Sequence, residues 1–317
     1  MSIEISLVLG AAVAAAVVLA MGPFMIPQLH KLKFGQSIRE EGPQSHQAKS
    51  GTPTMGGIMI VAGITAGALA AAGWSVELGL ALFMMLGHFV IGFVDDYIKV
   101  VKKHNLGLKA REKMLGQIVM VALVAWLAEL NTDIWIPFAG TIDIGAAFYV
   151  LLFFVLVGTT NAVNLTDGLD GLAAGTVTAA MLAFAAVCVI TGHHNLAIFC
   201  AASAGGCLAF LKFNAHPARI FMGDAGSLAL GGAVAAAGIL THTEVLLVVI
   251  GAVFVAEAMS VIIQVTSFKT TGKRVFLMSP IHHHFELKGW KETRVVHTFW
   301  MAGAVAGVCG LLLLKLG

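Results

Sequence analysis

Long apolar runs alternate with short polar segments along the whole chain. A helix of about 20 apolar residues crosses the hydrocarbon core of a bilayer, whereas irregular polar backbone is not tolerated there. The pattern therefore predicts an all-α, polytopic membrane protein of about ten transmembrane helices, with residues 1–317 forming a single integral-membrane domain. The expected spans are Ile5–Met25, Pro53–Ala72, Leu78–Val94, Met114–Leu130, Ile144–Gly158, Leu172–Ile190, Leu196–Phe213, Ala225–Leu240, Val245–Val265 and Val295–Leu314.

Composition strengthens this assignment. The chain is 58% hydrophobic and 11% charged, with a mean hydropathy of +0.91, whereas a soluble domain carries about 25% charged residues. We therefore expect a lipid bilayer as the surrounding medium and no nucleic-acid partner. The first run follows Glu4 without a basic segment before it, which favours a retained span over a signal peptide. The four cysteines lie within apolar spans and form no C-x-x-C pair, so they are expected to be small buried residues.

The basic residues are distributed asymmetrically between the loops. Of the 19 Lys and Arg residues, all but Lys315 fall in odd-numbered loops between the expected spans. Lys and Arg stay on the cytoplasmic side during membrane insertion. The distribution therefore predicts cytoplasmic odd-numbered loops and places both termini outside, on the periplasmic side. Orientation alone explains this asymmetry, so the function must be inferred from other residues.

Five aspartates occur at the cytoplasmic boundary, where orientation does not require them. Acidic groups beside hydrocarbon are costly unless another group compensates them, and a divalent cation would do so. Asp95 and Asp96 are consecutive, so on a regular helix they point about 100° apart. We therefore expect each to have a separate role. The alternative is that they end a span and form surface ion pairs with Lys99 or Lys102.

The segment NAVNLTDGLDG carries polar side chains at every third residue, at Asn161, Asn164, Asp167 and Asp170. In helical or 3₁₀ geometry this spacing produces one polar stripe that could bind a ligand. A simple helix cap with turn glycines is the alternative. In the segment FMGDAGS, Asp224 lies between two glycines just before a span. Its carboxylate could bind Mg²⁺, while the backbone N–H groups around it bind phosphate.

The last large loop contains SPIHHHFELKGW, with three consecutive histidines at positions 282–284. Zinc-binding helices space their histidines four residues apart, so phosphate contact by one or two imidazoles is the preferred interpretation, and a merely solvated loop is the alternative. His88, Glu257 and Gln264 interrupt apolar runs and are expected to be buried, hydrogen-bonded bundle residues. Gln264, near the cytoplasmic end of its span, is the best candidate among these three for a site role.

The order of these motifs resembles the polyprenyl-phosphate N-acetylhexosamine-1-phosphate transferases, and the SPIHHHFE segment is most similar to the phospho-N-acetylmuramoyl-pentapeptide-transferase branch. The resemblance spans nearly the whole chain. The segments that carry it are HQAKSGTPTMGG (His46–Gly57), FVDDY (Phe93–Tyr97), NAVNLTDGLDG, FNAHPARIFMGDAGS (Phe213–Ser227) and SPIHHHFELKGW.

This resemblance implies a bacterial plasma-membrane enzyme with its active site on the cytoplasmic face. It implies transfer of phospho-MurNAc-pentapeptide from UDP-MurNAc-pentapeptide to undecaprenyl phosphate, with Mg²⁺ as cofactor and a homodimer as the assembly. The essential carboxylates implied are Asp95, Asp96 and Asp224, with Asp224 as the metal ligand. The implied substrate-binding residues are Lys49, Thr54, Asn161, Asn164, Asp167, Asp170, Phe221, Gln264, His282, His283 and His284.

Two further alternatives stay open at this point. A sister enzyme that transfers GlcNAc-1-phosphate from UDP-GlcNAc would share most of these motifs. A secondary transporter would also have about ten spans and intramembrane carboxylates, but its polar interruptions should recur in two repeated halves near the membrane midplane. For the transferase, direct attack by the lipid phosphate is preferred over a covalent phospho-aspartate route.

Overall fold

The computed structural model describes residues 2–31, 49, 51–102, 107–128 and 131–317. The described residues are mostly helical, with one antiparallel hairpin. The predicted all-α, polytopic class is therefore confirmed. The elements are α1 Ile3–Lys31, α2 Gly57–Ala72, α3 Val76–Lys102, α4 Ala110–Leu127, β1 Asp133–Ile136, β2 Gly140–Asp143, α5 Ala147–Thr166, α6 Leu172–Ile190, α7 His194–Asn214, α8 Gly223–Leu240, α9 Glu244–Ile250, α10 Ala252–Thr271, α11 Ile281–Leu287 and α12 Glu292–Leu316.

Each predicted span overlaps a helix, and α6 has the bounds predicted for it. One predicted span is divided, because Gly251 separates α9 from α10. Among the described residues, 8 helices are long and apolar enough to cross a bilayer. Helix α2 has only 16 residues, and α4 carries charged residues in its first turn. The count of about ten spans stays a prediction, and the last two residues of the expected span Met114–Leu130 lie outside the described part of the chain.

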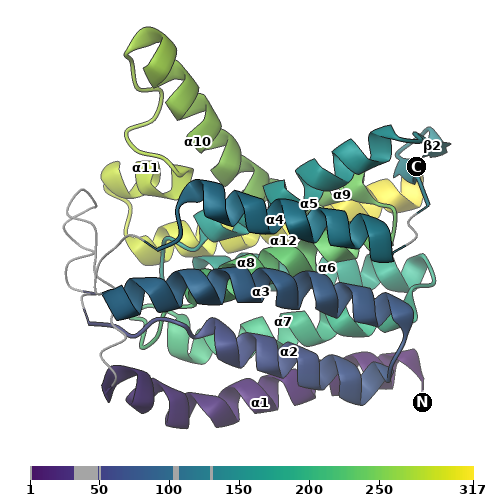
Figure 1. Ribbon diagram of the computed structural model, residues 1–317, viewed down its shortest axis with the longest axis horizontal. Coiled ribbons are helices and arrows are strands. Elements are labelled where there is room, and N and C mark those ends of the chain that lie inside the picture. The colour runs from purple at the N-terminus through teal and green to yellow at the C-terminus, as the bar shows by residue number, and fades with distance from the viewer. Residues whose placement is uncertain (1, 32–48, 50, 103–106, 129–130) are drawn as a thin grey trace.

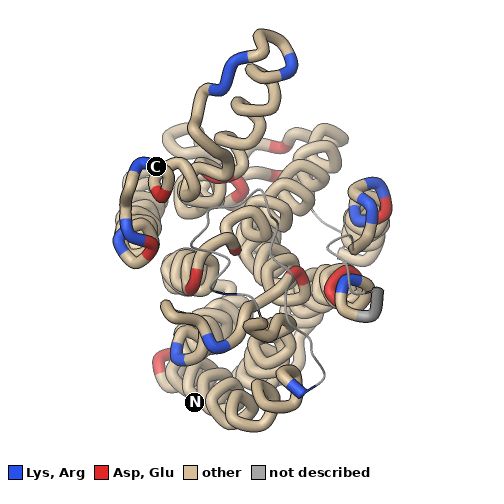
Figure 2. The backbone as a smooth tube through the Cα atoms, turned by 90° about the vertical axis from the view of Figure 1, so that its left-hand side faces the viewer, with Lys and Arg blue, Asp and Glu red and all other residues tan. Residues whose placement is uncertain are grey.

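The long helices run side by side, and their ends form two distinct faces of the bundle (Figure 1). Both chain termini and the β-hairpin lie at one end, while α11 and the C-terminal ends of α3 and α10 lie toward the other. Figure 2 faces the latter end and shows Lys and Arg gathered in its loops. The alternation of basic loops thus matches the arrangement in space, although Lys33, Arg39 and Lys103 lie outside the described residues.

Helix α8 forms the centre of the bundle (Figure 1). Every residue from Ala225 to Leu240 is buried, and the helix consists largely of alanine and glycine. Small side chains allow membrane helices to approach closely. A Cβ atom added at Gly231 would lie 2.5 Å from the Cα atom of Thr160 in α5. The composition of α8 therefore fixes the distance between the central helices, and it places Asp224 at one end of the core.

The hairpin is the main departure from the predicted all-helical pattern. Strands β1 and β2 pair with Asp133 opposite Asp143 and Ile136 opposite Gly140. The Trp135 N–H donates to the His242 carbonyl oxygen at 2.9 Å, which attaches the hairpin to the turn between α8 and α9. Each strand has only four residues, and neither DIWI nor GTID alternates apolar and polar residues over its whole length, so the period-two signal of a strand is missing from the sequence.

Candidate active site

Three carboxylates from two helices meet at the end of the bundle that carries the basic loops. Asp95 and Asp96 lie near the end of α3, and Asp224 lies in the first turn of α8. One ligand oxygen from each lies within 4.8 Å of the others. The approach depends on Gly92, because a Cβ atom there would lie 2.1 Å from the Asp224 carbonyl oxygen. The structure therefore brings Asp224 to two aspartates that lie 128 and 129 positions before it in the sequence.

Asp95 and Asp96 differ in their partners although they are neighbours in the chain. Asp95 Oδ1 accepts the Leu108 N–H at 2.7 Å, from the segment that follows α3. Asp96 Oδ2 accepts the Ala225 N–H at 2.9 Å, from the start of α8. Both side chains nevertheless supply an oxygen to the same cluster. The two side chains leave α3 in different directions, but both carboxylates are long enough to reach the cluster.

Two lysines compensate the charge of the carboxylate cluster. Lys99 Nζ lies 2.6 Å from Asp95 Oδ2 and 3.0 Å from Asp224 Oδ2. Lys113 Nζ lies 3.1 Å from Asp95 Oδ1 and 2.6 Å from Asp224 Oδ2. The i,i+4 spacing of Asp95 and Lys99 makes that pair recognisable in the sequence. The sequence indicates no such partner for Lys113, because its contact with Asp224 spans 111 positions.

The carboxylate cluster has the donor set that a hard divalent cation requires. Mg²⁺ prefers oxygen ligands and usually binds through one or two carboxylates together with waters and substrate phosphates. Asp95, Asp96 and Asp224 provide such oxygens within 4.8 Å of one another. The residues present therefore fit Mg²⁺, with Asp224 central because it faces both lysines and Asn164. A cation bound here would neutralise part of the negative charge of the carboxylates, which Lys99 and Lys113 otherwise compensate.

The four residues of the expected polar stripe on NAVNLTDGLDG lie in different surroundings. Asn161 Nδ2 donates to Gln117 Oε1 at 3.0 Å, which joins α5 to α4. Asn164 Nδ2 donates to Asp224 Oδ1 at 3.0 Å and to Ser227 Oγ at 2.8 Å. The stripe is broken because α5 ends at Thr166 and the chain turns before Asp170. Only Asn164 contacts the carboxylate cluster directly.

Asp167 lies just past the end of α5 and is half-buried. Burial raises the pKa of its carboxyl well above the ordinary value, and the negative charges of Asp224, Asp96 and Asp170 add to this effect. Its side chain makes no hydrogen bond within the part of the chain that the structure describes. A carboxylate in these surroundings is poised to bind a cationic or hydrogen-bonding group of a ligand.

Asp170 belongs to a second charged cluster around Lys49. Lys49 Nζ lies 2.8 Å from Asp170 Oδ1 and 2.5 Å from Glu292 Oε1. Asp170 Oδ2 lies 3.1 Å from His216 Nδ1 and accepts the Ala218 N–H at 3.0 Å. This arrangement is an ion-pair network that joins four segments of the chain. Glu292 and His216 were not predicted as site residues, because nothing in their local sequence indicates these distant partners.

Thr54 and Phe221 lie where two segments pair through their backbones. The Phe221 N–H donates to the Pro53 carbonyl oxygen at 2.8 Å, and the Gly56 N–H donates to the Phe221 carbonyl oxygen at 2.9 Å. Thr54 is buried, with 6% of its surface exposed. A Cβ atom added at Gly223 would lie 2.4 Å from Asp96 Oδ2 and 2.7 Å from Thr54 Oγ1. Thr54 therefore lies beside the carboxylate cluster.

The three consecutive histidines lie on α11 and do not converge on one point. His282 is fully buried and contacts Glu257, whereas His283 Nδ1 lies 2.8 Å from Glu286 Oε2. His284 Nδ1 accepts the Leu277 N–H at 3.1 Å. Gln264 is engaged in a similar way, because its Oε1 accepts the Phe276 N–H at 2.9 Å and its Nε2 donates to the Phe276 carbonyl oxygen at 2.9 Å. Their proposed contacts with substrate stay predictions.

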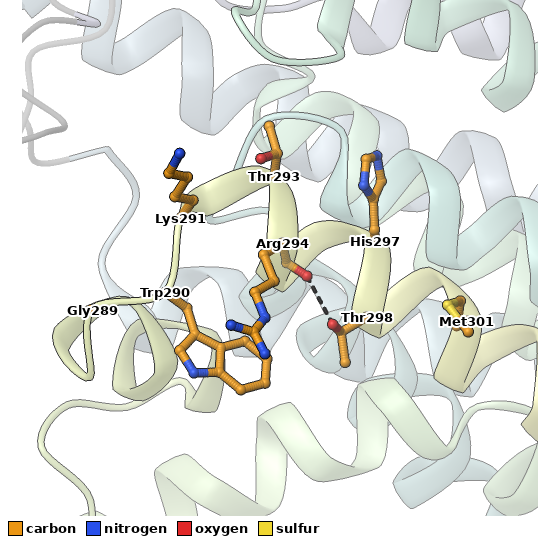
Figure 3. Close-up of a pocket in the computed structure, with 8 residues that line it drawn as sticks. All are labelled: Gly289, Trp290, Lys291, Thr293, Arg294, His297, Thr298 and Met301. Carbon is orange, nitrogen blue, oxygen red and sulfur yellow. Dashed lines mark hydrogen bonds between the residues drawn. The ribbon is translucent and has the colours of Figure 1, made fainter.

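A pocket of about 530 Å³ opens beside the start of α12 (Figure 3). The Arg294 guanidinium lies 4.3 Å from the centre of the Trp290 ring, and the Thr298 hydroxyl donates to the Arg294 carbonyl oxygen at 2.8 Å. None of the predicted site residues lines this pocket, which therefore does not contain the carboxylate cluster. Its lining consists of Gly289, Trp290, Lys291, Thr293, Arg294, His297, Thr298 and Met301.

The structure defines an integral-membrane protein with clustered carboxylates at one end of a helical bundle, and comparison with known families shows that it is an enzyme and of which class. The family described as "Glycosyl transferase family 4" matches residues 78–242, which include Asp95, Asp96 and Asp224. The motif described as "Phospho-N-acetylmuramoyl-pentapeptide-transferase signature 1" matches residues 49–61. The chain is thus a membrane-embedded glycosyl transferase.

Individual relatives are similar over nearly their whole lengths. The phospho-N-acetylmuramoyl-pentapeptide-transferase of Heliobacterium modesticaldum is 55% identical over 306 residues, covering 95% of each chain. That of Geobacillus kaustophilus is 54% identical over 316 residues, covering 97% of this chain and 98% of the relative. That of Bacillus subtilis is 54% identical over 301 residues, covering 92% of each. The chain belongs to the phospho-N-acetylmuramoyl-pentapeptide-transferase family and is a phosphoglycosyl transferase, as its motifs predicted.

Proposed function

We propose that this protein transfers phospho-MurNAc-pentapeptide from UDP-MurNAc-pentapeptide to undecaprenyl phosphate, which yields lipid I and UMP in peptidoglycan synthesis. The observation that carries this proposal is the cluster of Asp95, Asp96 and Asp224 at one end of a membrane bundle. Nearly the whole length of the chain is similar to enzymes named phospho-N-acetylmuramoyl-pentapeptide-transferase. A lipid-linked acceptor and a charged nucleotide donor would meet at such a boundary.

The chemistry requires positioning more than strong base catalysis. A phosphate monoester has a second pKa near 6, so the lipid phosphate is already largely ionised at neutral pH. Two anionic substrates must still be brought together, and catalysis of phosphoryl transfer rests on positioning and charge stabilisation. Lys99 and Lys113 provide positive charge beside the cluster. Asp95 or Asp96 orients the attacking phosphate, and Lys49 with Asp170 lies where the nucleotide is expected to bind.

Asp224, with Asp95 and Asp96 beside it, would hold Mg²⁺. When bound, the metal would neutralise charge on the diphosphate of the donor. Asn164 supports this arrangement, because its hydrogen bonds to Asp224 and Ser227 fix the Asp224 side chain at the start of α8.

We further propose a single in-line displacement. An oxygen of the lipid phosphate forms a bond to the sugar-linked phosphorus, the bond from that phosphorus to the bridging oxygen breaks, and UMP leaves with that oxygen. The alternative is a covalent phospho-aspartate intermediate. A donor with a chiral β-phosphorus distinguishes the routes: inversion of configuration is expected, and retention would exclude single displacement.

The proposed reaction is tested by measuring UMP release from UDP-MurNAc-pentapeptide in detergent micelles. Release should require both undecaprenyl phosphate and Mg²⁺, and lipid I should form in equal amount. A sister activity is tested in the same assay with UDP-GlcNAc as donor. Efficient turnover of UDP-GlcNAc but not of the muramoyl donor would overturn the proposed substrate. Uptake of substrate into vesicles without UMP release would instead indicate a transporter.

The cellular setting also belongs to this proposal. We place the protein in the bacterial plasma membrane with the carboxylate cluster on the cytoplasmic face, because the loops at that end carry the Lys and Arg residues (Figure 2). A homodimer is proposed from the family resemblance. Mass measurement of the protein in native-lipid nanodiscs tests this assembly, and a mass corresponding to a single chain would contradict it.

A further inference from the structure

The start of α12 carries a basic pocket that shares no residue with the carboxylate cluster. Lys291, Arg294 and His297 are among the residues that line this cavity of about 530 Å³. Within the part of the chain that the structure describes, neither Lys291 nor Arg294 forms an ion pair with a carboxylate. The Oε1 atom of their neighbour Glu292 instead lies 2.5 Å from Lys49 Nζ. The pocket therefore has positive charge without a compensating acid among the described residues.

The side chains around the pocket provide the donors that a phosphate group requires. The Arg294 guanidinium lies over the Trp290 ring, 4.3 Å from its centre (Figure 3). Stacking occupies the face of the guanidinium, whereas its N–H donors point outward in its plane and can bind phosphate oxygens. Lys291 adds an ammonium group and Thr293 a hydroxyl group to the same lining. A volume within the range of about 300–1,000 Å³ for small-molecule sites leaves room for a phosphate and the groups attached to it.

The exposed face of α12 continues from this pocket toward the other end of the bundle. Its residues follow one another at intervals of three or four and are apolar beyond Thr298, at Arg294, Thr298, Met301, Val305, Val308 and Leu312. Residues at this spacing share one side of a helix. The segment from Phe299 to Leu314 contains no charged side chain, as expected for a span within hydrocarbon. The pocket therefore lies where polar headgroups meet the hydrocarbon core, the level at which tryptophans such as Trp290 are enriched.

We propose that this pocket binds the phosphate of an anionic phospholipid, with an acyl chain of that lipid along Met301 and Val305. The occupant needs a negative charge at one end and an apolar part next to it, because the exposed surface of α12 changes from basic to apolar. Anionic phospholipids have both properties and attract the basic segments beside membrane helices. The site goes beyond the proposed transfer reaction and does not depend on it, since none of the residues assigned to substrate or metal lines the pocket.

Two double variants separate this site from a general attraction between basic loops and anionic lipid. Lys291→Gln/Arg294→Gln removes two positive charges from the pocket. Lys273→Gln/Arg274→Gln removes two positive charges from exposed positions just after α10, outside the pocket lining. The net charge changes equally in the two proteins, so a difference between them reports the pocket itself.

Native mass spectrometry of the intact chain in detergent measures how tightly each variant retains added lipid. The parent should retain phosphatidylglycerol about tenfold more tightly than phosphatidylcholine with the same acyl chains, since each basic residue near an anionic headgroup adds to the attraction. The pocket variant should lose most of this preference, whereas the loop variant should stay within about threefold of the parent. Equal losses in the two variants, or no loss in either, would overturn the proposal.

A cross-linking experiment on the parent sequence tests the same site without a substitution. A phosphatidylglycerol that carries a diazirine near the top of one acyl chain should attach to residues 295–305 of α12 when it is irradiated in nanodiscs. Attachment only to other helices would overturn the proposal, even if the pocket variant failed to fold. Melting curves in detergent without added lipid identify such a failure.

The same cross-link distinguishes the rival occupants. Inorganic phosphate should not displace the lipid, because it lacks an apolar part, and full displacement by it would indicate a free-phosphate site. Undecaprenyl phosphate in equal amount should leave the cross-link largely intact, because its proposed site is the carboxylate cluster. A two-chain mass without phosphatidylglycerol, reduced to one chain by the pocket variant, would show that a second copy covers this face. Displacement by either phosphate compound, or this last result, would overturn the proposal.

Discussion

Asp224 is the carboxylate on which the candidate site depends most. It faces Lys99, Lys113 and Asn164 and is the member of the cluster contributed by the central helix. Asp224→Asn removes the negative charge while keeping the shape of the side chain. We expect activity to fall by at least about 10³-fold at any Mg²⁺ concentration, because charge stabilisation supplies most of the rate in phosphoryl transfer. UMP release measured across a Mg²⁺ titration tests this prediction.

Asp143→Asn is a suitable control for that experiment. Asp143 is an exposed carboxylate on the hairpin, at the opposite end of the bundle, and its partners are Thr132 and the Gly145 N–H. Its replacement should leave UMP release unchanged. Restoration of Asp224→Asn activity by high Mg²⁺ would show that Asp224 contributes to metal affinity without being indispensable. Full activity at ordinary Mg²⁺ would exclude Asp224 as a metal ligand.

Asp167 should show a trade-off between stability and activity. Its pKa is raised by burial and by neighbouring carboxylates, so its charged form destabilises the folded protein at neutral pH. Asp167→Asn should therefore raise the melting temperature at pH 7 by roughly 2 °C or more while lowering transfer activity.

The sign of the pH dependence follows from the raised pKa of Asp167. Below the ordinary aspartate pKa of about 3.9, the carboxyl is neutral in the folded and unfolded states, so the stability gained by Asp167→Asn should disappear as the pH falls toward that value. Above it, the unfolded state ionises first and the gain should grow. Melting curves of the parent and the variant between pH 4 and 8 test this, and a gain that increases toward acid pH would contradict the assignment.

At the residue scale, the sequence indicated the acidic members of the site better than their partners. Asp95, Asp96 and Asp224 were recognised because carboxylates at a membrane boundary need compensation. Lys113, His216 and Glu292 were not, since their contacts join distant segments and local spacing carries no information about them. Glu257 was expected to be an ordinary buried residue, and only the three-dimensional arrangement reveals its partner His282.

The close packing of α8 against α5 leads to a prediction about elements. Gly231→Ala would place a Cβ atom 2.5 Å from the Cα atom of Thr160, which belongs to the backbone and cannot rotate away. We expect a loss of about 1–3 kcal/mol in the free energy of unfolding, as for other overpacked cores. Gly158→Ala is the control, because a Cβ atom there meets nothing within 4 Å.

The control should be neutral or stabilising, since alanine is favoured over glycine inside a helix by about 0.5–1 kcal/mol. Unfolding by denaturant in mixed micelles measures both variants. Equal effects at Gly231 and Gly158 would mean that helix propensity, and not interhelical distance, determines the role of glycine in these two helices.

Helices were predicted well because hydrophobic length is a strong signal in a bilayer. Three features could not be predicted from hydrophobic length. The break at Gly251 lies within a continuous apolar run, α11 has only seven residues, and each strand of the hairpin has four. Each of these features is much shorter than the roughly 20 residues of a membrane-spanning helix.

The arrangement of the whole molecule leads to a prediction about sidedness. Ala139 lies in the exposed hairpin turn and Lys288 follows α11 at the opposite end of the bundle (Figure 1). In a Cys309→Ser background, Ala139→Cys should react with a membrane-impermeant maleimide in intact cells. Lys288→Cys should react only after the membrane is opened. Reversed labelling would place the carboxylate cluster outside the cell.

At this scale the sequence was informative because a single rule relates all loops. Each helix that crosses the bundle reverses the side of the next loop, so the charge pattern of distant loops predicts which of them share an end. The contacts between helices are not predicted by this rule. The pairing of α3 with α8, which brings Asp95 and Asp96 to Asp224, depends on glycines such as Gly92 whose neighbours cannot be read from the sequence.

The burial of α8 has a consequence for the response of the protein to its surroundings. In the 18-residue apolar stretch of α8, 89% of the residues are buried, compared with 28% in the corresponding stretches of α1 and α12. A change in bilayer thickness acts on helices that touch lipid, which respond by tilting or by deforming the bilayer locally. Asp224 sits on the helix that lipid reaches least. A thinner or thicker membrane should therefore shift outer helices such as α1 and α12 before it displaces Asp224 on α8.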